Sequence, residues 1–272
     1  MNYRHAFHAG NFADCVKHAL LVWLIRALQR KPGGIAVLDT HAGAGAYDLG
    51  AAPAQRTGEW QGGIGRLLAE PPPALAEYLN LVEQIGLYPG SPALVRAMLR
   101  PQDRLLCCEL HPEDHAALRA RFAGDAQVAV HRRDAWEALG ALLPPRAGRG
   151  LVLIDPPYEA PDEFERVFAG LQRAHRRFAH GVHVAWYPVK HGAPVRALHA
   201  RLTESGMRDI LAAILLLRAP LDAARLNGCG LIVINPPFRF EQEAPAILDA
   251  LLQRLGTREA GEGALLERLA EE

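Results

Sequence analysis

The sequence predicts an α/β protein built on a mostly parallel, doubly wound sheet. Short apolar runs rich in β-branched residues alternate with stretches in which apolar residues recur every three to four positions. This alternation is typical of parallel strands that are covered by helices on both faces. Acidic residues follow several of the apolar runs, at the sheet edge where open α/β sheets bind their ligands.

The first part of the chain predicts a helix, a strand and a second helix. An apolar stripe at helical spacing covers 13–30, and the Lys-Pro-Gly-Gly sequence after it ends the helix. Residues 35–39 are typical of a buried strand. Ser91 is predicted to be the N-cap of a helix that reaches about Leu99, because Pro92 suits the first helical position.

The remaining elements continue the alternation until the end of the chain. We expect strands at 104–109, 127–130, 151–155 and 182–187, and helices from 111 and at 134–143, 161–178 and 193–206. Strands at 209–217 and 231–235 follow each other without a helical pattern, which predicts a terminal antiparallel hairpin. The polar stretch from Gly256 is expected to be loosely held.

Prolines and glycine pairs interrupt the alternation once. They predict an inserted helical subdomain at about 49–91 within a single domain of residues 1–272, which begins with a motif and helix at 1–32. Half of the residues are hydrophobic, which is enough for a sizeable core.

Charge and cysteine content exclude several classes of protein. The 30 basic residues equal the 30 acidic ones, which argues against strong unspecific nucleic-acid binding. Charged residues near the start and Arg26 interrupt the apolar stretches, so we expect neither a signal peptide nor a membrane span. The four cysteines form no C-x-x-C pair, as is typical of buried thiols in a reducing cytosol. We expect a cytoplasmic monomer.

The most informative motif is the apolar run 151–154 followed by Asp155-Pro156-Pro157-Tyr158. The prolines stiffen the turn, and the carboxylate lies at the ligand-binding end of a buried strand. Asp155 and the Pro156 carbonyl offer two acceptors beside the flat ring of Tyr158. This arrangement suits a planar group that carries an NH2, such as an adenine edge or a carboxamide.

Three further acids follow predicted strands. Asp39 precedes the glycine turn Gly43-x-Gly45, whose backbone N–H groups can approach a ligand closely. Glu109 could accept both ribose hydroxyls of an adenosine group, and Asp134 could accept a proton from its amino group. Each acid alone is better explained as a helix N-cap than as a ligand contact. Together with Asp155, however, they end four consecutive strands at one edge of the sheet.

A second motif, Asn235-Pro236-Pro237-Phe238, repeats the design with an amide in place of the acid. It lies in the predicted hairpin, on an antiparallel strand whose end faces the opposite edge of the sheet. We therefore expect it to be structural.

Ten short motifs follow one another from residue 3 to about 240. They are YRHAFHAGN at 3–11, AD at 13–14, KH at 17–18, LDTHAGAG at 38–45, RTGE at 56–59, YPGSP at 88–92, ELHP at 109–112, LIDPPY at 153–158, WYP at 186–188 and VINPP at 233–237. In these motifs and in their order the chain resembles the RlmJ-type family of ribosomal RNA adenine-N6 methyltransferases. The opening stretch is highly specific, whereas Asp-Pro-Pro-Tyr is shared by many amino-group methyltransferases.

This resemblance implies a Rossmann-like class I methyltransferase fold with a seven-stranded sheet. It also implies S-adenosylmethionine as cofactor and one adenine of 23S ribosomal RNA as substrate. The cofactor contacts that it implies are His18, His41, Ser91, Glu109 and Asp134, to which we add their neighbours Lys17, Asp39, Gly43, Ala135 and Asp155. Ala135 departs from the family pattern, which has glycine there. Catalysis is implied for Asp155, and a substrate-side role for Tyr3.

The motif suggests a mechanism for methylating an amino group. Asp155 and the Pro156 carbonyl would each accept one N–H, which directs the nitrogen lone pair toward the methyl donor. Tyr158 would stack on a base turned out of its helix. Arg4 and His5, with the nearby His8, are expected to meet RNA phosphates. No zinc spacing is present among the N-terminal histidines, so we expect no metal.

Three other functions remain open at this point. DNA-adenine or protein-glutamine methylation needs the same amino-group clamp. A nicotinamide-dependent oxidoreductase is disfavoured because the third glycine of the dinucleotide fingerprint is missing. A non-catalytic RNA-binding module is disfavoured by the neutral net charge.

Overall fold

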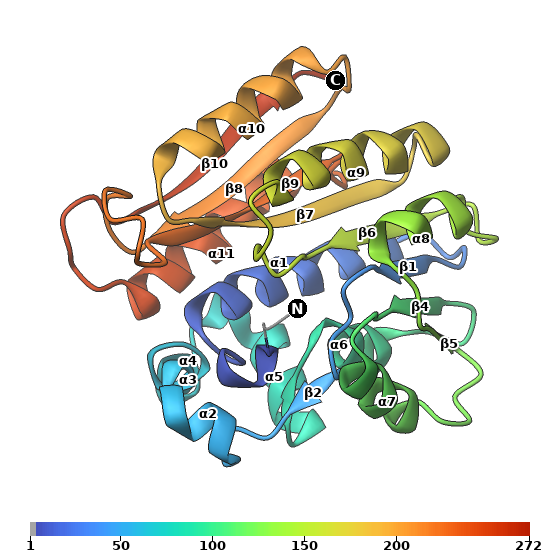
Figure 1. Cartoon of the computed structure of the whole chain (residues 1–272), viewed down its shortest axis with the longest axis horizontal. Helices are drawn as coiled ribbons and strands as arrows, with labels where there is room; N and C mark the ends of the chain where they lie inside the picture. Colours follow the sequence, from blue (N-terminus) through green and yellow to red (C-terminus); the bar gives the residue numbers. More distant parts are fainter. Residues whose placement is uncertain (1–3) are drawn as a thin grey trace.

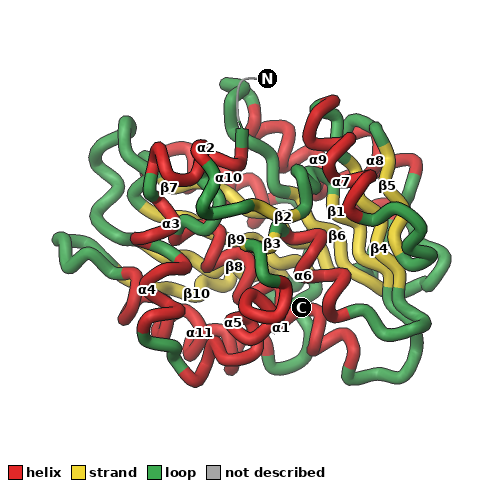
Figure 2. The backbone as a smooth tube through the Cα atoms, turned by 90° about the horizontal axis from the view of Figure 1, so that it is seen from below, coloured by secondary structure: helices red, strands yellow, loops and turns green. Residues whose placement is uncertain are grey.

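A computed structural model, which describes residues 4–272, shows one large sheet between two layers of helices (Figures 1 and 2). Within these residues the sheet has eight strands in the order β10-β8-β9-β7-β6-β1-β4-β5. In chain order they are β1 (Ala36–Asp39), β4 (Arg104–Cys108), β5 (Val128–His131), β6 (Gly150–Ile154), β7 (Val182–Val189), β8 (Ile210–Leu216), β9 (Gly228–Ile234) and β10 (Gly263–Ala270).

Strand direction divides the sheet into a parallel part and an antiparallel part. Strands β5, β4, β1, β6 and β7 are parallel to one another, so their carboxyl ends share one edge. Strand β9 runs antiparallel between β7 and β8. The predicted Rossmann-like, mostly parallel sheet is confirmed. The expected count of seven strands is wrong. The predicted antiparallel hairpin is formed by β8 and β9, but β10 lies outside it, so the hairpin is not at the end of the sheet.

The eighth strand comes from the segment that we expected to be loosely held. Residues 263–270 form β10, which pairs antiparallel with β8. Leu269 packs into the core on one face of the sheet, and Ala264 and Leu266 pack against the core on the other face, whereas Leu265 and Glu267 are exposed. An edge strand tolerates charged side chains at its exposed positions, so the polar composition of this segment concealed a strand.

Helices cover both faces of the sheet. On one face lie α1 (Phe12–Gln29), α6 (Ser91–Met98), α7 (Pro112–Arg121) and α11 (Phe240–Leu255), and on the other α8 (Ala135–Ala141), α9 (Glu163–Arg177) and α10 (Gly192–Glu204). The sequence prediction missed α11, which contains Pro245. None of the helices within residues 4–272 has the length and apolar character needed to cross a bilayer.

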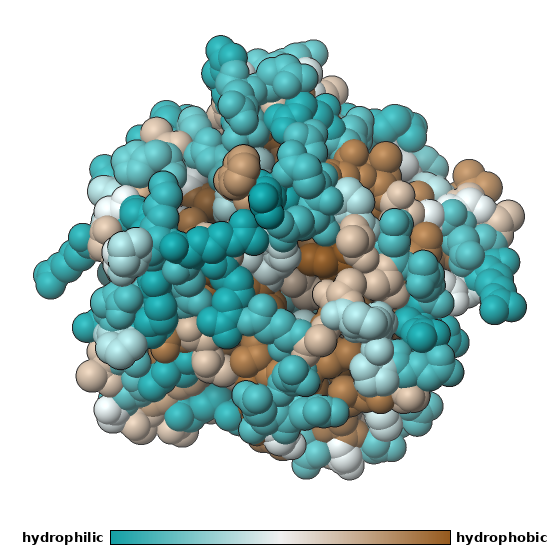
Figure 3. All heavy atoms as spheres, turned by 180° about the vertical axis from the view of Figure 1, so that it is seen from behind, coloured by the Kyte–Doolittle hydropathy of each residue, from teal (hydrophilic) through white to brown (hydrophobic). Residues whose placement is uncertain are grey.

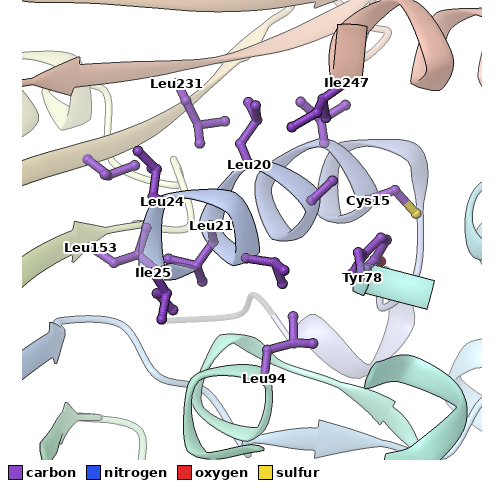
Figure 4. Close-up of a cluster of buried hydrophobic side chains, with 14 of the residues drawn as sticks. Cys15, Leu20, Leu21, Leu24, Ile25, Tyr78, Leu94, Leu153, Leu231 and Ile247 are labelled. Carbon is purple, nitrogen blue, oxygen red and sulfur yellow. The ribbon is translucent and has the colours of Figure 1, made fainter. Parts of the chain in front are cut away.

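Helix α1 is the centre of the larger core. Its apolar side chains Leu20, Leu21, Leu24 and Ile25 are fully buried and face Leu153 of β6, Leu231 of β9 and Ile247 of α11 (Figure 4). Because this helix is enclosed on nearly all sides, any charged residue on it must find a partner inside the protein. In the view of Figure 3 hydrophilic side chains cover most of the surface, and hydrophobic ones form scattered patches.

The segment between β1 and α6 is mostly helical. It contains β2 (Ala46–Tyr47), α2 (Ala52–Thr57), α3 (Glu59–Gly62), α4 (Ile64–Ala69), η2 (Pro73–Leu75), α5 (Ala76–Ile85) and β3 (Tyr88–Pro89), with β2 and β3 paired antiparallel. Helix α5 packs on α1, and α4 packs on α11, so these helices extend the core around α1.

The second Pro-Pro motif lies at the edge opposite to Asp155, because β9 is antiparallel to β7. Asn235 has a left-handed backbone (φ 53°), and its amide donates hydrogen bonds to the carbonyls of Ala179 (2.7 Å) and Gly181 (2.8 Å). Both carbonyls belong to the loop that precedes β7. The motif therefore closes that loop onto the end of β9, as expected of a structural element.

Replacing Asn235 by Ala should lower the free energy of unfolding by about 2 kcal/mol. The two hydrogen bonds of the amide are lost, and alanine adopts a positive φ less readily than asparagine does. Urea denaturation measures this loss. Asn235→Gly is the matched control, since it restores the backbone freedom and should recover part of the loss. Wild-type stability in Asn235→Ala would contradict this account.

Candidate active site

The structure brings the four predicted acids to one edge of the sheet. Asp39, Glu109, Asp134 and Asp155 follow β1, β4, β5 and β6, and these strands are adjacent in the order β6-β1-β4-β5. Parallel strands present their carboxyl ends together, so the acids line one continuous rim.

Asp155 is held by a buried lysine of α1. The Lys17 ammonium donates to Asp155 Oδ2 at 2.6 Å and to Asp14 Oδ1 at 2.9 Å. Lys17 is 5% exposed and Asp14 3%. Asp14 Oδ2 also accepts from the Gly10 N–H (3.0 Å) and pairs with His5 Nε2 (2.9 Å). A chain of ionic contacts therefore runs from the N-terminal segment to the end of β6.

The charges in this chain stabilise one another. Burial alone would lower the pKa of Lys17, but the carboxylates of Asp14 and Asp155 outweigh it and hold that pKa well above its usual value. Burial alone would raise the pKa of Asp14, but His5 and Lys17 hold it well below its usual range. Lys17 is therefore an ammonium ion and Asp14 a carboxylate near neutral pH.

The sequence prediction placed Lys17 in the cofactor site and missed both Asp14 and the pairing with Asp155. One signal was available, because two charged residues at i and i+3 stand within the apolar stripe of a helix. The partner at Asp155 is 138 residues away, so no local pattern indicates it.

Lys17 binds neither the backbone N–H nor the second carboxylate oxygen of Asp155. The backbone N–H of Asp155 donates to His41 Nδ1 at 3.3 Å. Burial lowers the pKa of His41 to about 4, so the ring is neutral and Nδ1 can accept. Among residues 4–272, no side chain or backbone group donates to Asp155 Oδ1. One carboxylate oxygen is thus fixed by Lys17 while the other remains available as an acceptor.

The Pro-Pro turn fixes the ring of Tyr158. This residue has φ 52°, and its hydroxyl donates to the Trp186 carbonyl at 2.8 Å. Its ring meets Phe164 and Trp186 edge to face, with centroids 5.0 and 5.7 Å apart. Because the hydroxyl is engaged, Tyr158 offers its ring rather than a free donor. Pro156 is buried beneath it.

The glycine turn and Glu109 form the neighbouring part of the rim. Gly43 has φ +58°, and a Cβ there would lie 2.4 Å from Tyr47 Oη, so only glycine fits. Glu109 accepts from the Gly43 N–H (2.8 Å) and from the His111 N–H (2.7 Å). These bonds connect the loops after β1 and β4. Each carboxylate oxygen keeps a second lone pair.

Asp39 is fully buried behind the glycine turn. It accepts from Ser91 Oγ at 2.6 Å and from the His41 N–H at 3.3 Å, and burial raises its pKa to about 6. Ser91 is not the N-cap that we predicted, because Gly90 occupies that position. A buried carboxylate needs a donor, and the Ser91 hydroxyl serves Asp39 instead of the helix end.

Asp134 is the N-cap of α8, the role that the sequence offered as the alternative to ligand binding. Its Oδ1 accepts from the Trp136 and Glu137 N–H groups at 2.9 and 3.0 Å, next to buried Ala135. Oδ2 accepts no hydrogen bond within the part of the chain that the structure describes. Capping therefore leaves one oxygen of Asp134 available to a ligand.

His18 is buried beside Lys17 and carries an unsatisfied nitrogen. Its Nδ1 lies 3.1 Å from Tyr88 Oη, whereas Nε2 has no partner among the described residues. Burial, followed by the charge of Lys17, lowers the pKa of His18 to about 3, so the ring is neutral. A buried ring nitrogen without a partner is a candidate contact for a bound molecule.

The N-terminal residues that we expected to meet RNA have partners within the protein. Tyr3 lies outside the described residues. Arg4 pairs with Glu113 of α7 at 2.8 Å, and His8 Nδ1 with Glu59 Oε1 at 2.9 Å. His5 packs edge to face on Tyr47 while it pairs with Asp14. Their contact with RNA stays a prediction.

The antiparallel β9 inserted between β7 and β8, with the acids at the ends of β1, β4 and β5 beside Asp-Pro-Pro-Tyr, defines a class I methyltransferase. Within that class, residues 32–265 match the family described as ribosomal RNA large subunit methyltransferase D, RlmJ. The chain belongs to this family.

Individual relatives agree with this assignment. The chain is 40% identical over 263 residues to the Ribosomal RNA large subunit methyltransferase J of Escherichia coli (strain K12), and 38% identical over 264 residues to the protein of that name from Haemophilus influenzae; each comparison covers 94% of both chains. A crystal structure of protein LPL1258 from Legionella pneumophila is 34% identical, with a TM-score of 0.87 over 96% of this chain and 98% of that one. A crystal structure of a probable spermidine synthase from Corynebacterium glutamicum is 16% identical, with a TM-score of 0.52 over 93% of this chain and 74% of that one. At this identity the similarity shows a shared fold alone.

Replacing Lys17 by Met should lower the free energy of unfolding by about 3 to 5 kcal/mol, because two buried carboxylates lose their shared cation. Urea denaturation at neutral pH measures the loss. Adding Asp14→Asn should restore part of it, since one of the unpaired charges is then removed. Equal stability of the wild type and Lys17→Met would contradict the ionic chain.

Asp39 should make stability depend on pH. Its pKa of about 6 exceeds the ordinary value of 3.8, so its stabilising contribution is complete below pH 3.8 and is lost as the pH rises through about 6. Relative to the wild type, Asp39→Asn should therefore gain about 2 to 3 kcal/mol between pH 4 and pH 7.

Urea denaturation across that range tests the sign. Asp103→Asn is the matched control, because Asp103 is also fully buried but, with Arg100 as its partner, its pKa is lowered. Between pH 4 and pH 7 the stability difference between this variant and the wild type should be nearly constant, because a lowered pKa places the titration of Asp103 below that range. A pH-independent difference for Asp39→Asn would contradict the raised pKa.

Proposed function

We propose that this protein methylates the N6 amino group of one adenine in 23S ribosomal RNA, with S-adenosylmethionine as cofactor. The observation that carries the proposal is the Asp155 carboxylate, whose Oδ2 is held by Lys17 while Oδ1 is available, at the start of the Pro-Pro turn that carries Tyr158. Membership of the RlmJ family supports the substrate, since the relatives' names specify large-subunit ribosomal RNA. An enzyme of this kind would work in the cytoplasm, and we expect it to act as a monomer.

The residues at the rim fit the cofactor. Gly43 lets the turn close against Tyr47 and Glu109, and Glu109 and Asp134 keep acceptor capacity for hydroxyl and amino groups. The cofactor-binding set that we propose is Lys17, His18, Asp39, His41, Gly43, Ser91, Glu109, Asp134, Ala135 and Asp155. In this set Asp39 and Ser91 support the turn from behind, because both are buried and bonded to each other. When bound, S-adenosylmethionine supplies a methyl group on a positively charged sulfur.

The clamp around Asp155 would overcome the weak nucleophilicity of the adenine amino group, whose lone pair is delocalised into the ring. Asp155 Oδ1 accepts one N–H, and the Pro156 carbonyl accepts the other. The hydrogen bond from Lys17 fixes the carboxylate, so the acceptor is in place before the substrate arrives. Positioning and electrostatic complementarity supply the catalytic effect.

Proton transfer makes small demands on the protein. After the methyl group has moved, the amino nitrogen carries a positive charge and an acidic proton. The carboxylate of Asp155 can stabilise that charge across the hydrogen bond, and water can accept the proton. A strong general base is therefore unnecessary.

Tyr158 provides the surface on which the target base would stack. Its hydroxyl bond to the Trp186 carbonyl and its edge contacts with Phe164 and Trp186 fix the plane of the ring. Stacking on an aromatic ring compensates a base for leaving its own helix, and an RNA loop makes that departure cheap.

Replacing Asp155 by Ala should reduce kcat for methyl transfer to 23S ribosomal RNA by about 100- to 1000-fold or more, because the amino-group acceptor is removed. The cofactor should still bind, because the other nine residues of the proposed cofactor-binding set are unchanged. A tritiated methyl donor offered with ribosomal RNA, DNA and protein measures the transfer and identifies the acceptor.

Asn235→Ala is the matched control, because it alters the equivalent residue of the second Pro-Pro motif at the opposite edge of the sheet. It should keep full activity under conditions where it is folded. Undiminished turnover in Asp155→Ala would refute the clamp, and label on DNA or protein in place of RNA would refute the substrate.

A further inference from the structure

A hollow of about 410 Å³ lies on the far side of Tyr158, between the loop after the Pro-Pro turn, the end of β7 and the start of α10. We propose that this hollow, here called the flank pocket, receives a nucleotide that neighbours the target adenine in the RNA. The proposal rests on the proposed function and extends it to a second RNA subsite. The lining of the flank pocket includes Tyr158, Phe164, Pro188, Lys190, His191 and Ala197.

The flank pocket adjoins the candidate active site at Tyr158. Tyr158 lies three residues after Asp155 and lines the hollow, so its ring forms a wall shared by the two sites. Helices α9 and α10 contact each other on the same face of the sheet (Figure 1). An RNA strand whose target base reaches Asp155 must place a neighbouring nucleotide next to that shared wall.

The walls of the flank pocket suit a nucleobase. Three prolines, Pro161, Pro188 and Pro194, contribute to the lining, and their fixed φ angles make the hollow preformed. Phe164 adds a second aromatic ring, held edge to face against Tyr158. Splayed RNA bases are recognised by stacking on such rings, and the volume lies in the range of small-molecule sites.

The rim of the pocket carries positive charge. Lys190 is exposed and makes no ion pair with any residue from 4 to 272. Its backbone is fixed, because Asn227 donates to the carbonyls of Val189 and Lys190 at 2.9 and 2.7 Å. Glu165, an acid in the lining, is already paired with Arg201. The uncompensated charge therefore favours a phosphate group.

His191 adds a hydrogen-bond donor on the same rim. Its Nδ1 accepts the Ala193 N–H at 3.2 Å, so the proton of the neutral ring is on Nε2. An exposed lysine and an imidazole N–H on consecutive residues match the backbone of a single-stranded nucleic acid. An apolar protein segment would use the walls but leave both polar groups unsatisfied.

The salt dependence of RNA binding tests the rim. Lys190→Ala should reduce the slope of log Kd against log salt concentration by about 0.7, the value for one lost phosphate contact on single-stranded RNA. Lys31→Ala is the matched control, since Lys31 is also exposed but precedes β1 at the opposite edge of the sheet. Equal slopes for Lys190→Ala and the wild type would overturn the phosphate contact.

Filling the hollow tests the base contact. Ala197 is an exposed residue of α10 in the lining, so Ala197→Trp should fold and block the space. An RNA without a base at the neighbouring position should bind the wild type about tenfold more weakly than intact RNA. With Ala197→Trp, intact and abasic RNA should bind equally, because the pocket is already closed.

The outcomes separate this proposal from the proposed function. Methylation of the intact RNA by the wild type reports on the function alone. If the wild type methylates it while Ala197→Trp still discriminates against abasic RNA by the same factor, the flank pocket proposal fails. Loss of self-association in Ala197→Trp, measured by sedimentation without RNA, would instead assign the pocket to a second copy of the chain and overturn the proposal.

Discussion

The ammonium group of Lys17, enclosed between the carboxylates of Asp14 and Asp155, is the contact on which the rest of the site depends. It joins the most buried helix of the molecule to the end of β6. An ion pair of this kind adds little net stability over an apolar replacement, because its charges must leave water. Its effect is geometric, since one oxygen of Asp155 is fixed while the other stays available. His5 extends the same chain to the N-terminal segment, so that segment and Asp155 are physically coupled.

The two Pro-Pro motifs show that topology, more than the motif, determines what a tetrapeptide can do. Asp155 ends a parallel strand and lies among three other acids, whereas Asn235 ends an antiparallel strand at the opposite edge. The Asn235 amide donates hydrogen bonds to two backbone carbonyls of a loop. The Asp155 carboxylate is bound on one side only. The stiff Pro-Pro turn thus stabilises the fold at Asn235, whereas at Asp155 it supports the proposed chemistry.

Much of this arrangement could be predicted from the sequence, because strand periodicity and chain order together bring the acids to one edge. Asp39, Glu109, Asp134 and Asp155 each follow a strand that the apolar pattern indicates. Contacts between distant segments could not be predicted, and the pair of Lys17 with Asp155 is the clearest case. Local rules also failed where a tertiary partner competed, as when Ser91 bonded to Asp39 instead of capping α6. Strand β10 was missed because half of an edge strand faces water and carries charge.

The central claim is that Lys17 positions Asp155 for methyl transfer. The most direct measurement is the single-turnover rate of methyl transfer by Lys17→Met, with RNA and cofactor both saturating and the protein folded. A shift of the acceptor carboxylate should lower that rate by about 100-fold, even though both ligands are saturating. A wild-type rate in this variant would contradict the account.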